Sequence, residues 1–153
     1  MSEAAKKVAD YKTILLDQTK IVAFLPMPPQ SNHLYGGLDV KRRYPMPKLV
    51  AFKKQIETMS LVLRSNLKAR FDLQTYQGVP IKLERRFYFH RSSVFSKAGT
   101  VKRMDVSNRI KACDDALEIL FGIDDSYVFF GSEEKCISQT PEEFVRLEIT
   151  RIN

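Results

Sequence analysis

Histidine and cysteine are scarce in this sequence, with two of each among 153 residues. Because the chain has only His33 and His90, it cannot build a zinc site on three histidines. Cys113 and Cys136 have neither the spacing of paired metal ligands nor the number expected of a disulfide framework. Any chemistry that the protein performs is therefore expected to use carboxylates and a hard cation.

Long apolar runs are missing as well. No segment approaches the roughly 20 consecutive apolar residues that a membrane-spanning helix needs. Residues 1–12 include Glu3, Lys6, Lys7 and Asp10, and they lack the apolar core of a signal peptide. Together with the few cysteines, these features predict a reduced, cytoplasmic protein.

The composition is that of one globular domain with a basic character. Hydrophobic residues make up 44% and charged residues 28% of a chain whose length suits a single core. The 25 Lys and Arg residues outnumber the 18 Asp and Glu residues, giving a net charge of +7. A positive charge favours a polyanionic partner, because binding phosphates releases counterions. Charge alone does not decide this, since many basic proteins bind no nucleic acid.

Hydrophobic periodicity predicts a polar extension over residues 1–19 and one domain over residues 20–153. Short strands are expected at residues 20–25, 79–90, 127–130 and 145–150. Helices are expected from residue 48 for about 20 residues and over residues 106–120. Residues 30–47 and 91–100 are rich in glycine, proline or polar residues and are predicted loops. The economical arrangement is a single α+β domain with a small mixed sheet packed against two main helices.

Acidic and polar residues gather on and around the second predicted helix. Asp105, Asn108 and Asp115 follow one stripe of this helix, and Lys111 lies beside it. The pair Asp124–Asp125 comes just after the helix. A helix of this length keeps its ends about 20 Å apart. Asp125 can therefore join Asp105 only if the following strand runs back alongside the segment that precedes the helix, and the sequence leaves this open.

Carboxylates that meet in this way would suit Mg²⁺, which prefers oxygen ligands. Such a cation polarises a phosphoryl oxygen and activates an attacking water, while Lys111 could offset charge on the phosphate or orient that water. Each residue also has a simpler interpretation. Asp105 can be a helix N-cap, Asp124–Asp125 a turn, and Lys111 a solvated surface residue.

The segment from Asp105 to Val128 closely resembles the RusA family of Holliday-junction resolvases. The family pattern is Asp-x-Asp-Asn-x-x-Lys, then an Asp-Ala-Leu helix, then a Gly-containing turn into Asp-Asp-x-x-Val. Residues 24–32, the helix from Leu49 and the strand at 146–150 also match the family, so the resemblance covers about Lys20 to Arg151.

The resemblance implies a homodimer that uses Mg²⁺, with Mn²⁺ as a substitute, to nick two opposing strands of a four-way DNA junction. Asp105 matches the first metal-binding Asp, and Asn108 matches the family Asn. Asn108 and Asp115 are expected to be supporting residues. Lys111 matches the catalytic Lys. Asp125 matches the last acidic metal ligand, with Asp124 adjacent to it.

One position departs from the family pattern, because Ser107 stands where the family has its second Asp. Three outcomes stay open. Ser107 or a water completes the metal coordination, Asp124 or Asp115 supplies the missing carboxylate, or cleavage is reduced or lost. The first outcome predicts a junction-resolving endonuclease with Ser107 among the metal ligands. The last makes the protein a junction-binding protein instead.

DNA contacts are expected from basic residues in the two predicted loops and in the segment before Asp105. The candidates are Lys41, Arg42, Arg43, Lys97, Lys102 and Arg103. The last two precede the proposed metal site, where a scissile phosphate must arrive. Each of these charges can equally be an ordinary solvated side chain.

Overall fold

The structure, a computed structural model, describes residues 14–30, 35–36, 44–45, 47–104 and 106–152. Within them the chain forms a five-stranded sheet in the order β1-β2-β7-β5-β6 and a two-stranded ladder of β3 and β4. The strands are β1 (Ile14–Leu16), β2 (Lys20–Pro26), β3 (Tyr35–Gly36), β4 (Tyr44–Pro45), β5 (Ile81–Phe89), β6 (Val128–Ile137) and β7 (Phe144–Arg151). The helices are α2 (Pro47–Arg64), α3 (Leu67–Gln74), α4 (Arg91–Val94), α5 (Ser107–Phe121) and the 3-10 turn η3 (Asp125–Tyr127). The expected α+β fold with a small mixed sheet is confirmed.

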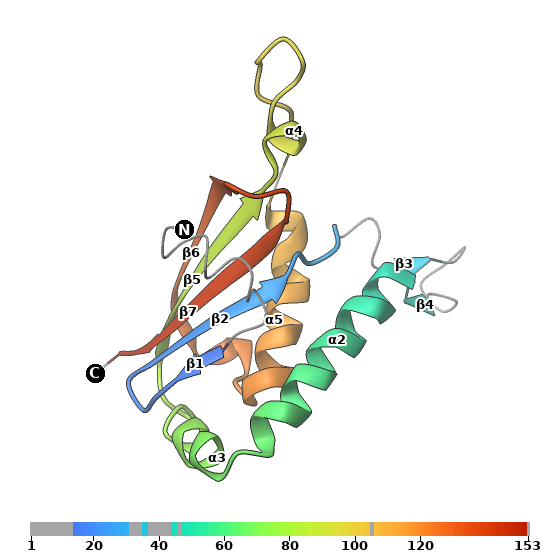
Figure 1. Cartoon of the computed structure of the whole chain (residues 1–153). Coiled ribbons are helices and arrows are strands. Elements are labelled where there is room, and N and C mark those ends of the chain that lie inside the picture. The colour runs from blue at the N-terminus through green and yellow to red at the C-terminus, as the bar shows by residue number, and fades with distance from the viewer. Residues whose placement is uncertain (1–13, 31–34, 37–43, 46, 105, 153) are drawn as a thin grey trace.

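One pair of strands in the larger sheet is parallel. β5 and β6 run side by side, from Ile81 opposite Val128 to Phe89 opposite Ile137. The other neighbouring strands of this sheet pair antiparallel. Parallel neighbours need a crossover connection. The chain therefore leaves the far end of β5, runs back through α5, and enters β6 beside the start of β5 (Figure 1).

One apolar core joins a face of the sheet to α2 and α5. Alternate residues of β2, β5 and β7 point into it, as the strand periodicity predicted. The helices contribute Leu49, Phe52, Ile56, Ala112, Cys113, Ala116, Leu117 and Leu120. This packing fixes α5 against the sheet, and thus fixes where the ends of α5 lie.

The first predicted helix is divided in two. α2 ends at Arg64, and Asn66 begins α3 by accepting a hydrogen bond from the Ala69 amide at 3.2 Å. Leu67, which continues the apolar stripe in sequence, belongs to α3 and is 61% exposed. The prediction of one continuous helix was therefore wrong in this last turn, because an N-cap residue interrupts the stripe.

The second predicted helix is confirmed within one residue at each end. Val106 occupies the N-cap position, and Gly122 closes the helix with a left-handed φ of 65°. The Gly122 amide donates to the Glu118 carbonyl at 2.8 Å. A left-handed residue at this position is typical of glycine, which has no Cβ to clash.

One predicted strand is longer than expected, and one edge strand was not predicted. β6 continues to Ile137, whereas apolar character predicted only residues 127–130. Its second half carries Glu133, Glu134 and Lys135, which an edge strand can expose to water. At the other edge, β1 lies inside the predicted polar extension and pairs antiparallel with β2. Within the described part of the chain, every helix is too short or too polar to pass through a bilayer.

Residues 90–104 form an arm that projects beyond the end of the sheet (Figure 1). α4 opens the arm, and a bridge between Phe95 and Val101 closes its hairpin. The Arg91 guanidinium lies over the Phe95 ring, 4.8 Å from its centroid. The predicted polar loop is thus an ordered hairpin that leads directly to the start of α5.

Candidate active site

The start of α5 carries two of the predicted site residues. Ser107 is the first residue of the helix and Lys111 follows one turn later, and both are exposed to solvent. Asp105 and the side chain of Asn108 lie outside the described residues. This end of α5 adjoins the base of the arm, so polar groups of both segments share one region.

Asp115 is turned toward α2. Its carboxylate lies 3.8 Å from the ammonium of Lys53, with 35% of each side chain exposed. Asp115 is also eight residues beyond Ser107, which separates them by about 12 Å along the helix. Within this chain, Asp115 therefore pairs with a lysine of α2.

Asp124 and Asp125 form the turn after α5. The Asp124 carboxylate accepts a hydrogen bond from the Ser126 amide at 2.8 Å and so caps η3. Hydrogen bonds with Ser126 lower the pKa of Asp124 below its ordinary value. Asp125 is the first residue of η3, and its side chain is exposed to solvent. The turn interpretation therefore holds for Asp124, while Asp125 is left accessible.

The two parts of the predicted site lie at opposite ends of α5. The helix has 15 residues, so its ends are about 22 Å apart. Because β6 runs parallel to β5, the chain does not return toward the start of α5 before Asp125. Among the described residues, no three His, Cys, Asp or Glu side chains gather closely enough to hold a metal ion. Asp125 therefore lies at the opposite end of α5 from Ser107.

A buried arginine anchors the middle of α5 to the sheet. Arg85 of β5 is 5% exposed, and it donates to Asp114 of α5 at 2.6 Å and to Glu133 of β6 at 3.0 Å. Breaking a buried charge pair is strongly destabilising, so this network holds α5 in place.

Electrostatics link this network to the turn. Burial raises the pKa of the Asp114 carboxyl, hydrogen bonding and attraction from Arg85 oppose the rise, and the negative charge of Asp125 adds to it. The sequence contained a signal for Arg85, because it falls on the buried parity of β5 with Leu83 and Phe87. The prediction passed over it because a charged side chain is rarely buried.

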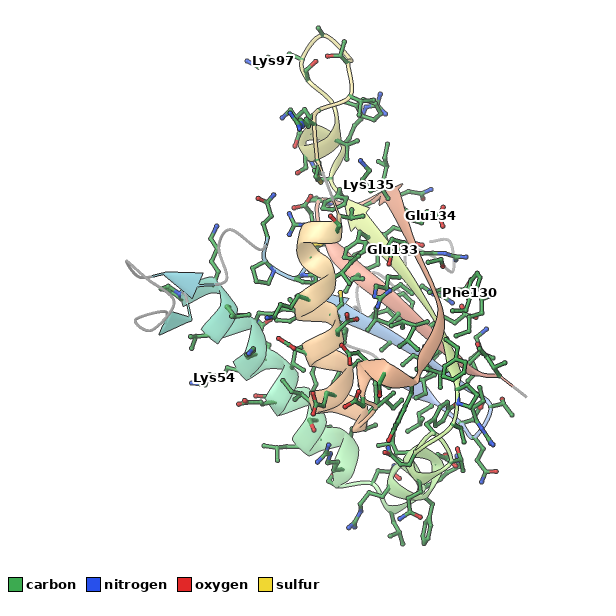
Figure 2. All side chains as sticks on the ribbon, turned by 180° about the vertical axis from the view of Figure 1, so that it is seen from behind. Lys54, Lys97, Phe130, Glu133, Glu134 and Lys135 are labelled. Atoms are coloured by element: carbon green, nitrogen blue, oxygen red, sulfur yellow. The ribbon has the colours of Figure 1, made fainter. Side chains whose placement is uncertain are left out.

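A lysine of β6 holds the segment that enters α5. Lys135 Nζ, on β6, donates to the Met104 carbonyl at 2.9 Å. Figure 2 shows Lys135 beside the base of the arm, with Lys97 at the arm's outer end. No sequence feature marked Lys135, because the strand was expected to end before it. It ties the far end of β6 to the chain just before Asp105.

The Pro-rich exit of β2 is also fixed beside the start of α5. Arg109 donates a hydrogen bond to the Pro28 carbonyl, and its guanidinium lies 5.3 Å from the centroid of the Phe89 ring. Between this exit and α2 is a groove of about 450 Å³. Its polar lining consists of Gln30, Lys48, Gln55 and Arg109.

The predicted DNA-contacting residues fall in two places. Lys97, Lys102 and Arg103 belong to the arm and are exposed. Lys102 Nζ also donates to the Ser92 carbonyl at 2.8 Å, across the base of the hairpin. The other three candidates, residues 41–43, lie outside the described residues. No Asp or Glu occurs from residue 90 to residue 104, so every charged residue of the arm is basic.

Comparison with known proteins tests the resemblance. The model of the family described as "Endodeoxyribonuclease RusA" matches residues 26–149. This chain belongs to the RusA family. A search among curated proteins finds no match. The RusA family consists of endodeoxyribonucleases that resolve Holliday junctions, and its members generally depend on divalent metal ions. The matched range begins in β2 and ends in β7, so it contains the arm, α5 and the Asp124–Asp125 turn.

Proposed function

We propose that this protein is a Mg²⁺-dependent endonuclease that resolves four-way DNA junctions by paired hydrolysis of phosphodiester bonds. The observation that carries this proposal is the RusA match over residues 26–149, which includes the motif from Asp105 to Asp125. The two symmetric cuts are best made by a homodimer, since a two-fold axis provides two equivalent sites.

Each motif residue has a proposed role. Asp105 and Asp125 bind the divalent cation, with Ser107 and Asp124 as further candidate ligands, and Mn²⁺ can take the place of Mg²⁺. Lys111 offsets negative charge that develops on the scissile phosphate. The described acidic residues of one chain do not fit such a cation site, because Asp124 and Asp125 lie at the far end of α5.

The arm is proposed to hold the DNA near the start of α5. Lys97, Lys102 and Arg103 are exposed there without any acidic neighbour in the arm. Such side chains bind phosphates and position a duplex without reading its sequence. Lys41, Arg42 and Arg43 are proposed to add further phosphate contacts.

Ser107 supports a second candidate function, a junction-binding protein with reduced or lost cleavage. Serine at the first position of α5 supplies a neutral hydroxyl where the family has a carboxylate. The basic arm would still bind branched DNA in the absence of any cleavage.

One assay separates these functions. A labelled four-way junction and a linear duplex of matched sequence are incubated with the protein in Mg²⁺, in Mn²⁺ and with a chelator. Paired nicks on the junction alone, lost with chelator and with Asp105→Asn, are the expected result. A gel shift of the junction without product in either metal would favour the binding protein. Equal binding to duplex and junction would contradict both functions.

A further inference from the structure

The arm of residues 90–104 has an ordered tip. The Ser96 amide donates to the Thr100 carbonyl at 2.8 Å, and the Gly99 amide donates to the Ser96 carbonyl at 2.9 Å. Gly99 takes a left-handed φ of 82°, a conformation that other residues rarely adopt. The Ser96 and Thr100 hydroxyls add a hydrogen bond of 2.7 Å. These contacts hold residues 96–100 in one tight turn.

The arm is also fixed at its root. The Lys102 amide donates to the Val94 carbonyl at 2.7 Å, and the His90 amide donates to the Glu143 carboxylate at 2.9 Å. The Val94 side chain packs against the apolar core. An arm that is held at both its root and its tip loses little conformational entropy when it binds a partner.

One face of this hairpin is apolar. Phe95 and Val101 are directly opposite each other in its bridge, so their side chains lie on the same side of the ribbon. Val101 is 67% exposed, and Phe95 is half-buried beneath the Arg91 guanidinium. The pair lies just below the tip of a segment that projects away from the sheet (Figure 1). The arm therefore presents an apolar side chain to whatever it meets.

The charge of the arm indicates which partner this face meets. Its charged residues are all basic and exposed, namely Arg91, Lys97, Lys102 and Arg103. Apolar side chains among cations suit DNA with accessible bases, because the cations bind phosphates while the apolar groups contact base faces. In a linear duplex the base faces are covered by stacking. At the branch point of a four-way junction the stacks of the duplexes end, so base faces can be reached.

The spacing along the chain agrees with a cut close to the branch point. Val101 precedes Asp105 by four residues, a span of at most about 14 Å. Each base step advances a duplex by about 3.4 Å. With Val101 at the branch point, Asp105 would thus lie within about four base steps of it.

We propose that Phe95 and Val101 form a wedge that enters the branch point of a four-way junction, with Val101 leading, and so distinguishes a junction from a linear duplex. The proposal rests on the proposed function, to which it adds the residues that select the branched substrate. Lys97, Lys102 and Arg103 bind phosphates of the flanking duplexes. Apolar side chains inserted between base steps unstack them in other DNA-binding proteins.

Binding measured in the presence of a chelator tests the wedge without reference to cleavage. Val101→Thr keeps the branched shape of the side chain and replaces one methyl with a hydroxyl, so the hairpin should stay folded. The ratio of the Kd for a linear duplex to the Kd for the junction is expected to fall about fivefold, because apolar contact with the bases is lost. The Kd for the duplex should change less than about twofold, since the phosphate contacts remain.

Val62→Thr is the matched control, because Val62 is 69% exposed and lies on α2, outside the arm. This variant should keep the wild-type ratio of the two Kd values. Val101→Ile retains an apolar side chain of branched shape and should keep the ratio as well. A ratio in Val101→Thr equal to that in Val62→Thr would overturn the proposal.

A fluorescent base reports the wedge directly. The base analogue 2-aminopurine, placed beside the branch point, fluoresces more strongly when it is unstacked. Saturating wild-type protein is expected to raise the fluorescence, and saturating Val101→Thr should raise it much less. An equal rise with Val101→Thr, or no rise with the wild type, would contradict the wedge.

The same junction separates failure of the wedge from failure of the proposed function. A wild-type protein that raises the fluorescence but cuts no junction in Mg²⁺ would support the wedge and refute the nuclease. A wild-type protein that cuts the junction without any rise in fluorescence would support the nuclease and overturn the wedge.

Discussion

The two ends of α5 differ in charge and in what they can bind. At the start, Lys111 is exposed beside an arm that has no acidic residue, and the first turn of the helix carries no acidic residue either. At the other end, Asp124 and Asp125 are exposed in a turn. Metal-assisted hydrolysis needs carboxylates and phosphate-binding groups at one place. Under the proposed function Lys111 acts at one end of α5 and Asp125 at the other, so variants at the two ends should fail in different ways.

The largest effect is expected at the acidic end. Asp125→Asn should lower the single-turnover cleavage rate of a labelled junction about 1,000-fold, because a neutral amide is a poor ligand for a hard cation. Asp124→Asn should change this rate less than about threefold, since Asn caps a turn as well as Asp does. Gel shifts in the absence of metal should show that both variants still bind the junction.

The pH dependence of unfolding distinguishes the two aspartates further. Because the native pKa of Asp124 is lowered by Ser126, its contribution to stability is complete above the ordinary carboxyl pKa. It is lost as the pH falls through the lowered value. Asp124→Asn should flatten this acidic part of the profile. If Asp124→Asn also stopped cleavage, Asp124 would be a ligand as well as a cap.

A smaller effect on cleavage is expected at the basic end. Lys111→Ala should reduce the cleavage rate about 100-fold and change the Kd for the junction little, as expected for a group that acts mainly in the transition state. Lys97→Ala should instead weaken binding. It should also reduce the slope of log Kd against log salt concentration by about 0.9, which corresponds to the loss of one phosphate contact. Binding titrations at several salt concentrations measure the Kd and this slope.

Lys54 offers a matched control for these lysines. It is exposed on α2, away from the arm, as Figure 2 shows. Lys54→Ala should change neither rate nor binding. If Lys111→Ala lost as much binding as cleavage, Lys111 would be a DNA contact, and the division between the two ends of α5 would need revision.

The sequence predicted the elements better than their directions. The limits of α5 followed from its apolar steps and from Gly122, and the buried face of β5 followed from strict alternation. These are local properties of the chain. Whether β6 runs parallel or antiparallel to β5 depends on pairing between distant segments, which periodicity does not encode. That the chain does not return toward the start of α5 before Asp125 therefore became visible only in the fold.

Two residues that hold α5 and its entry segment were missed for a related reason. Arg85 had the right parity but the wrong chemistry for a buried position, and only its two carboxylate partners explain its burial. Lys135 lies in the charged half of β6, where an exposed edge strand gives no alternation to detect. Both residues act through contacts that are distant in sequence. The family motif points to candidate residues, and the strand pairing shows at which end of α5 each described candidate lies.

The smallest of these effects is expected at Ser107, where the start of α5 departs from the RusA pattern. Ser107→Asp adds a carboxylate at the first helical position, where negative charge is favourable for the helix. If the missing charge limits metal affinity, the Mg²⁺ concentration for half-maximal cleavage should fall about tenfold. Ser107→Asn adds a neutral amide of the same size as the Asp carboxylate, and it should leave that concentration unchanged. Loss of activity in Ser107→Asp alone would mean that the metal site is built around serine, and that the start of α5 in this chain binds its cation differently from the family pattern.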